Sequence, residues 1–277
     1  MTAPAILRRL YTDTPFLVEG ALAALLRLDL NLAEHPGMKG MREKVMPQIE
    51  RIGNLAVVPV NGALARKPEP FEMAFGGIED TDAIRSLVEQ AAVDPAVAGI
   101  LLEFDSPGGF YTGGPELADA IRAADRVKPV VSWTGGQMAS LAYWTGSQAS
   151  QVIASRSATV GSIGSYIAVY DVTKLLDGFG VKVELFKNKE ASFKAAGLPG
   201  TSLSDAQREH LQTRAQDGFD EFRKAVLSTR ASVPEDAMRG QTFTGIEARK
   251  VGLVDRVGDR AFALSVIRQQ VRERARS

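Results

Sequence analysis

Two glycine-rich segments, each placed where an apolar run ends, carry the residues whose types and spacing could do chemistry. The first is Asp105-Ser-Pro-Gly-Gly109, and the second is Gly135-Gly-Gln-Met-Ala-Ser140. Glycines let the backbone turn sharply and leave its N–H groups unobstructed by side chains. Backbone amides aimed at one point form an oxyanion hole, and a serine beside them can act as the nucleophile of acyl transfer. A plain strand-to-helix turn and a packed or N-capping serine are the alternatives.

Ser140 is expected in the first turn of a helix over about 138–149, where the positive end of the helix dipole favours developing negative charge. The backbone N–H of Leu141 can point at the same place. Both glycine segments are expected to follow parallel strands, whose C-terminal ends meet at one edge of a sheet, where active sites collect. An amide-rich loop beside a serine is the layout that acyl transfer needs.

A serine nucleophile needs a base, and the sequence has only two histidines to offer. His35 lies in a Pro-Gly break, and His210 lies in a polar helical pattern, so a Ser-His-Asp triad has little support. The chain has no metal-ligand spacing and no nucleotide-binding glycine motif, so we expect neither metal nor cofactor. Lysine is the remaining candidate, because burial disfavours the charged ammonium and leaves a neutral amine able to accept a proton.

Composition excludes several other classes of function. The 277 residues are 45% hydrophobic and 24% charged, with 33 basic and 33 acidic residues and no cysteine. Such a balance gives no basic excess for nucleic acid, and the chain can form no disulfide. The most apolar N-terminal stretch, 16–32, contains three charged residues, so we expect no membrane span or signal peptide and a cytoplasmic location.

Hydrophobic patterning predicts an α/β fold with a mostly parallel core sheet and flanking helices. Apolar strands near 55–60, 97–104, 129–133 and 151–154 alternate with helices in βαβ order. We expect a helical N-terminal arm over 1–50, with helices near 16–30 and 41–51, one domain over 51–258, and a basic C-terminal helix over 259–277.

Four blocks of the sequence resemble the signal peptide peptidase A (SppA) type of serine protease, which has the ClpP/crotonase fold. They are Asp105–Gly109, Met138–Trp144, Ala158–Gly164 and Phe243–Asp255, and they occur in the family's order and spacing. The resemblance implies that Ser140 is the nucleophile and that a downstream lysine is its base. Lys194, in the block Ser192–Pro199, fits best, with Lys187 and Lys189 as second choices.

The same resemblance assigns the remaining site residues. It implies that Ser162 hydrogen-bonds and orients the lysine, and that the oxyanion donors are the N–H groups of Gly108 (or Gly109) and Leu141. The sequence departs from the family in one place, since Leu141 and Ala142 replace two small residues, commonly glycines. A bulkier side chain there leaves the N–H intact and alters the shape of the pocket.

The implied activity is that of a serine endopeptidase with a Ser-Lys dyad. Anchorless members of the family resemble the capsid-assembly proteases of tailed phages, which process scaffold and head proteins, so we expect such protein substrates in a host cytoplasm or procapsid. A cellular SppA-like peptidase is the alternative; a crotonase-type acyl-CoA enzyme or an inactive assembly protein is less expected. The family assembles into rings or bowls, which implies a homo-oligomer.

Overall fold

The computed structural model describes residues 46–68, 72–73 and 76–276. Within them, two compact units can be distinguished. The sheet unit comprises 46–164 and 219–276, and the insert unit comprises 165–218. The division falls inside the range 51–258 that the sequence suggested as one domain. Helix α9 (Asp205–Thr229) contributes its first part to the insert unit and its last part to the sheet unit.

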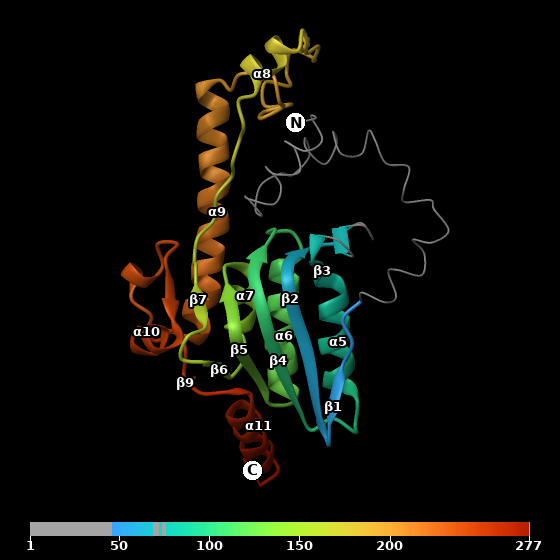
Figure 1. The fold of residues 1–277 in the computed structure, drawn as a ribbon, viewed down its shortest axis with the longest axis vertical. Helices are drawn as coiled ribbons and strands as arrows, with labels where there is room; N and C mark the ends of the chain where they lie inside the picture. Colours follow the sequence, from blue (N-terminus) through green and yellow to red (C-terminus); the bar gives the residue numbers. More distant parts are fainter. Residues whose placement is uncertain (1–45, 69–71, 74–75, 277) are drawn as a thin grey trace, which may run out of the picture. The chain divides into compact units, whose positions relative to one another are not determined.

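The sheet unit is built on nine strands, which Figure 1 shows with their helices. The main path runs β1-β2-β4-β5-β6-β9, while β3 pairs with β2, β7 with β5, and β8 with β7. All pairings are parallel except β1 with β2 and β7 with β8. The strands are β1 Glu50–Ile52, β2 Leu55–Ala65, β3 Ile78–Asp80, β4 Gly99–Gly109, β5 Val130–Ala139, β6 Gln151–Ala154, β7 Thr159–Gly161, β8 Thr242–Thr244 and β9 Arg256–Val257.

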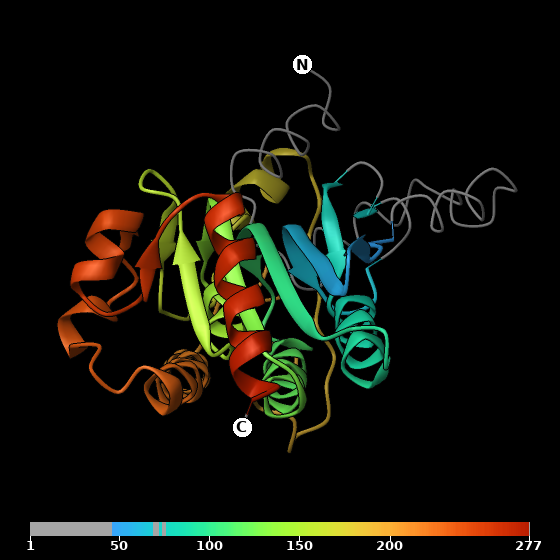
Figure 2. The same cartoon turned by 90° about the horizontal axis from the view of Figure 1, so that it is seen from below.

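Helices cover both faces of this sheet. On one face, α5 (Thr81–Val93), α6 (Gly114–Val127), α7 (Leu141–Gly146), α10 (Gly245–Lys250) and the end of α9 pack into a single core. On the other, α11 (Arg260–Arg274) inserts Ala263, Val266 and Ile267 between strand residues; Figure 2 shows this helix alongside the sheet. Because both faces are covered, β2, β4 and β5 begin with nearly continuous apolar runs rather than alternating ones.

The α/β class and the mostly parallel sheet are therefore confirmed, and the strand predicted at 151–154 is β6. Two local predictions are wrong. The predicted helix over 138–149 is shortened to 141–146, because β5 continues through its glycines to Ala139. The helix predicted near 41–51 is wrong at its C-terminal end, because Glu50 and Arg51 belong to strand β1 and pair with β2. The arm predicted over 1–50, including the helix near 16–30, falls mostly outside the described residues.

The insert unit contains little regular structure between the sheet and α9. Its elements are the short helix α8 (Thr173–Gly178) and the first part of α9. Near the end of the sheet unit, a 3₁₀ turn at Glu235–Ala237 precedes β8. Among the described residues, no helix has both the length and the apolar character needed to cross a bilayer.

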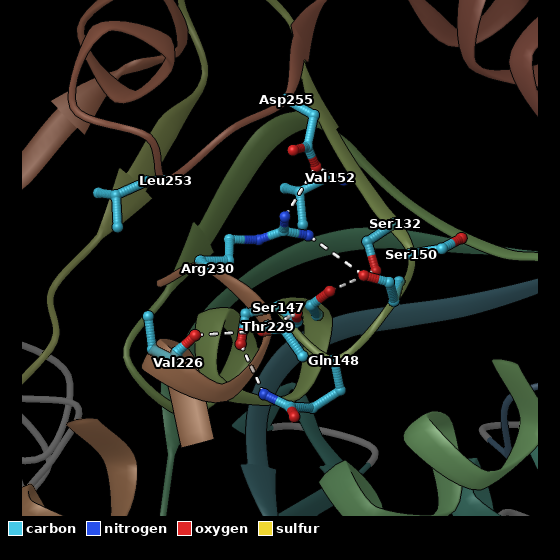
Figure 3. A network of polar contacts seen from close by, with 12 residues as sticks. Ser132, Ser147, Gln148, Ser150, Val152, Val226, Thr229, Arg230, Leu253 and Asp255 are labelled. Atoms are coloured by element: carbon cyan, nitrogen blue, oxygen red, sulfur yellow. Dashed lines mark hydrogen bonds and ion pairs between the residues drawn. The ribbon is translucent and has the colours of Figure 1, made fainter. Parts of the chain in front are cut away.

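A buried arginine ties the end of α9 to the segments around it (Figure 3). The Arg230 side chain is 5% exposed; its guanidinium lies 2.9 Å from the Asp255 carboxylate and donates to the Ala149 carbonyl at 3.2 Å. The same carboxylate accepts the Val152 N–H at 2.7 Å. The Arg230 charge is buried while the Asp255 carboxylate is partly exposed, so the pair compensates chiefly the burial of the guanidinium.

Arg230→Ala should therefore lower the free energy of unfolding by on the order of 2 kcal/mol, between the scales for an exposed pair and a fully buried one, because the Asp255 carboxylate is 35% exposed. Arg223→Ala removes a guanidinium from the exposed pair with Glu235 and should cost much less, since exposed ion pairs contribute little to stability. Urea unfolding followed by circular dichroism measures both. Equal losses in the two variants would contradict the structural role given to Arg230.

Candidate active site

Ser140 occupies the sharp junction between β5 and α7. Its backbone has φ 50° and ψ −127°, a combination that residues with a side chain rarely adopt. The Ser140 N–H donates to the Gly161 carbonyl at 2.8 Å, and the Ser140 carbonyl accepts the Trp144 N–H at 2.9 Å. The sequence suggested that Ser140 lies in the first turn of the helix, but it directly precedes the helix. Its side chain is half-buried.

The backbone of Gly108 touches this junction directly. A Cβ placed on Gly108 would stand 2.6 Å from the Ser140 Cβ and 2.8 Å from the Leu141 nitrogen, and φ here is +101°. Only glycine satisfies both the conformation and the lack of space. The structure therefore brings together Ser140 and two of the predicted oxyanion donors, Gly108 and Leu141, whereas Gly109 is packed against Leu64 of β2.

Two strand irregularities bring the chain to this contact. Between β4 and β5 the register passes from Phe104↔Thr134 to Ser106↔Met138, so one residue of β4 faces three of β5. The Asp105 carboxylate fills the bulge: it accepts the Gln137 N–H at 3.2 Å and lies where a Cβ on Gly136 would stand. The glycines that appeared to end β5 instead let it bend around Asp105.

The large side chain of Leu141 does not block the site. It is 3% exposed and packs over Gly114, where a Cβ would stand 2.2 Å from the Leu141 Cδ1. As the first residue of α7, Leu141 has a backbone N–H with no partner inside the helix. The departure from the small residues of the SppA pattern therefore places a side chain in the core and leaves the amide beside Ser140.

Two buried aromatic residues of α7, Tyr143 and Trp144, anchor this helix to the surrounding core. The Tyr143 hydroxyl donates to the Leu253 carbonyl at 2.8 Å, and burial raises the pKa of Tyr143 above its usual range, which keeps the donor protonated. The Trp144 ring stacks on Phe222 of α9 with centroids 4.9 Å apart and is met edge-on by Tyr111. These contacts hold the helix that follows Ser140 against the sheet.

Ser162 directly follows β7, the strand that pairs with the end of β5 next to Ser140. Ala139 pairs with Gly161, and Ser162 follows with a left-handed φ of 54°. The Ser162 N–H donates to the Gln241 carbonyl at 2.8 Å. The predicted orienting serine is thus one residue from the carbonyl that holds the Ser140 N–H.

Lys194 belongs to the insert unit, so the predicted dyad draws its two residues from different units. The Lys194 side chain is exposed, and its backbone N–H donates to the Ala191 carbonyl at 3.1 Å. The alternative Lys187 donates its Nζ to the Ser192 carbonyl at 3.2 Å. His210 lies in the same unit, with its ring 5.2 Å from that of Phe193. In the part of the chain that the structure describes, no group of acidic and histidine residues could hold a metal ion.

The model of Peptidase family S49 matches residues 122–273, which include the Ser140 junction. The chain belongs to peptidase family S49. Three relatives resemble it across most of its length: "Capsid assembly protease C" of Escherichia phage lambda (31% identical, 78% of this chain), "Protease 4" of Salmonella typhi (31%, 75%) and "Head-tail preconnector protein GP5" of Enterobacteria phage P21 (28%, 84%).

The S49 chain spans 49%, 33% and 48% of these three relatives, respectively. Among solved structures, a putative enoyl-CoA hydratase/isomerase family protein from Hyphomonas neptunium is similar with a TM-score of 0.47. The identity is 18%, and the similarity covers 84% of this chain and 77% of that one.

Sequence reasoning missed two residues that shape the site, Asp105 and Ser106. Both stand in the block that drew attention for its glycines. The signal was there, because a carboxylate and a hydroxyl ahead of Pro-Gly-Gly are side chains that hydrogen-bond nearby backbone groups. Which backbone they bind depends on the neighbouring strands, which the block alone does not reveal.

Gly108→Ala should displace the Ser140 junction, because the new methyl group has no space. We expect at least about 100-fold slower labelling of Ser140 by a fluorophosphonate probe, the scale for a misplacement of about 1 Å. Gly53→Ala is the control: Gly53 also has a positive φ of +64°, but nothing lies within 4 Å of its Cβ position. Labelling of both variants at the wild-type rate would show that the junction does not depend on the contact.

Proposed function

We propose that this S49 protein is a serine endopeptidase in which Ser140 is the nucleophile and Lys194 its general base. The observation that carries the proposal is the Ser140 junction itself. A serine in a strained backbone conformation lies against the Gly108 backbone, next to an amide at the start of α7. That arrangement offers a nucleophile and backbone donors at one place, as acyl transfer requires.

The distribution of backbone strain supports this assignment. Among the described residues, four that are not glycine have a positive φ: Lys67, Ser140, Ser162 and Ala195. Two of them are proposed site residues, and a third directly follows Lys194. Each such conformation costs on the order of 1–3 kcal/mol and tends to persist where function requires it. Strain therefore coincides with the nucleophile, the orienting serine and the chain beside the base.

The proposed mechanism proceeds through an acyl-enzyme. Neutral Lys194 takes the proton of the Ser140 hydroxyl as the oxygen attacks the scissile carbonyl carbon. The N–H groups of Gly108 (or Gly109) and Leu141 stabilise the resulting oxyanion, and Ser162 orients the lysine amine. The lysine then protonates the leaving amine, and a water molecule activated by the same amine hydrolyses the ester. No metal or cofactor enters the reaction.

This mechanism requires that Lys194 and Ser140 meet in the active enzyme and that the amine be shielded from bulk water, with room for the one molecule that hydrolyses the ester. Because the Lys194 side chain is exposed in the described chain, we propose that assembly completes its surroundings. A homo-oligomer is the expected active form, since association of identical chains is a common way to cover such surfaces.

The substrates that we propose are scaffold and head proteins of a phage capsid, processed in the host cytoplasm or in the procapsid. The names of two relatives, a capsid assembly protease and a head-tail preconnector protein, support this setting. A cellular peptidase of the SppA type is the second candidate, and the similarity to Protease 4 of Salmonella typhi favours it. The two candidates share the chemistry and differ in substrate.

Ser140→Ala and Lys194→Ala should each abolish cleavage of a candidate scaffold protein while leaving the fold intact. The first removes the oxygen that attacks the carbonyl carbon, and the second removes the amine that accepts the proton. Lys187→Ala and Lys189→Ala are matched controls from the same segment and should keep turnover within about threefold of wild type. Mass spectrometry of the fragments measures cleavage, and circular dichroism measures folding.

A Lys194→Ala enzyme with near-normal turnover would refute the base assignment. Wild-type protein that cuts casein but leaves the scaffold protein intact would favour the cellular peptidase. Loss of cleavage in Lys187→Ala instead of Lys194→Ala would move the base to that residue.

A further inference from the structure

The hydroxyl of Ser106 bridges two strands beneath the Gly108 contact. Ser106 is completely buried. Its Oγ donates to the Gly62 carbonyl of β2 at 2.6 Å and accepts the Gly108 N–H at 3.2 Å. One hydroxyl has one proton to donate and two lone pairs to accept with, so both bonds form at once. Ser106 thereby connects β2 to the residue whose backbone touches Ser140.

We propose that Ser106 is a positioning residue for the oxyanion site, an inference that rests on the proposed function. The Gly108 N–H belongs to the peptide between Pro107 and Gly108, and a second glycine follows. Because glycine adopts many backbone angles, such a peptide needs an outside partner to fix its plane. The Ser106 hydroxyl supplies that partner and fixes the direction in which the Gly108 N–H points.

The carbonyl that receives the Ser106 proton is itself firmly held. Gly62 has a φ of +62°, and the Gly77 carbonyl oxygen lies 1.9 Å from where its Cβ would stand. On either side, the Ala63 N–H donates to Gly77 at 3.0 Å and the Asn61 N–H to the Glu79 carboxylate at 2.9 Å. A shift in the pairing of β2 with β4 occurs at this glycine. The Ser106 hydroxyl is therefore bonded to a part of β2 whose backbone is held in place by its neighbours.

The lengths of the two bonds indicate how Ser106 acts during the reaction. The bond to Gly62 is short, whereas the bond from the Gly108 N–H is longer than the usual value of about 2.9 Å. In the free enzyme, Ser106 satisfies a buried donor that would otherwise be left unpaired. A developing oxyanion is a stronger acceptor than a neutral hydroxyl, so the Gly108 N–H can share its proton with the oxyanion while Ser106 keeps the peptide plane in place.

Steady-state kinetics on a fluorogenic peptide that the wild-type protein cleaves tests this role. Ser106→Ala should lower kcat by about 10- to 100-fold with KM within about threefold, the pattern of an interaction that matters in the transition state. Ser132→Ala is the matched control. Ser132 is another completely buried strand serine, but its Oγ donates to the Gly146 carbonyl at 2.8 Å, away from Gly108.

The control variant should lose thermal stability as Ser106→Ala does and keep its kcat within about twofold of wild type. Ser106→Cys fills the same space with a weaker hydrogen-bonding group, and its kcat should lie between those of wild type and Ser106→Ala. This variant replaces Ser106→Ala in the test if the alanine variant does not fold. An unchanged kcat in the Ser106 variants, or an equal loss in Ser132→Ala, overturns the proposal while Ser140-dependent cleavage stands. A wild-type protein without Ser140-dependent cleavage overturns the proposed function and this inference with it.

Discussion

The end of β4 lies so close to the junction between β5 and α7 that no side chain fits between them. The distance from a Cβ on Gly108 to the Ser140 Cβ would be 2.6 Å, well inside van der Waals contact. This contact fixes the residue type at 108, places the Gly108 backbone beside the hydroxyl-bearing residue, and explains why both strands bulge just before it. Pro107 fits the same region because a bulge does not require its missing N–H.

A serine held at a positive φ needs supporting contacts from the residues around it. Gly161 binds the Ser140 N–H, and the buried Tyr143 hydroxyl anchors the following helix to the Leu253 carbonyl. Farther back, the Arg230–Asp255 pair joins the end of α9 to β6 and to the turn after α7. The strain at one residue is thus offset by many ordinary contacts, which is how strained backbone persists in proteins.

Most of the architecture could be predicted from the sequence because apolar patterning reports it directly. Continuous apolar runs such as Leu55–Val58 predict buried parallel strands, and the strand at 151–154 was placed correctly. Glycine was harder to interpret. Gly135 and Gly136 looked like the end of a strand, whereas they allow a bulge around Asp105, and that depends on a side chain from the neighbouring strand.

The candidate site shows the same limit. Ser140 and the glycine block 105–109 could be singled out from local sequence, since each lies in a short segment, whereas the choice of Gly108 as a donor rested on the resemblance. The bond from Ser106 to Gly62 joins residues 44 positions apart and requires the register of β2 on β4. Lys194 was assigned by resemblance and stays a prediction; its side chain is exposed in the described chain, whereas the sequence argument for a lysine base assumed burial.

The most direct test of this account is a crystal structure of the protein with a peptide boronate bound covalently to Ser140. The account predicts that one boronate oxygen accepts hydrogen bonds from the backbone N–H groups of Gly108 and Leu141 while Ser140 keeps its positive φ. A boronate oxygen turned away from both amides, or a Ser140 backbone relaxed to negative φ, would contradict it.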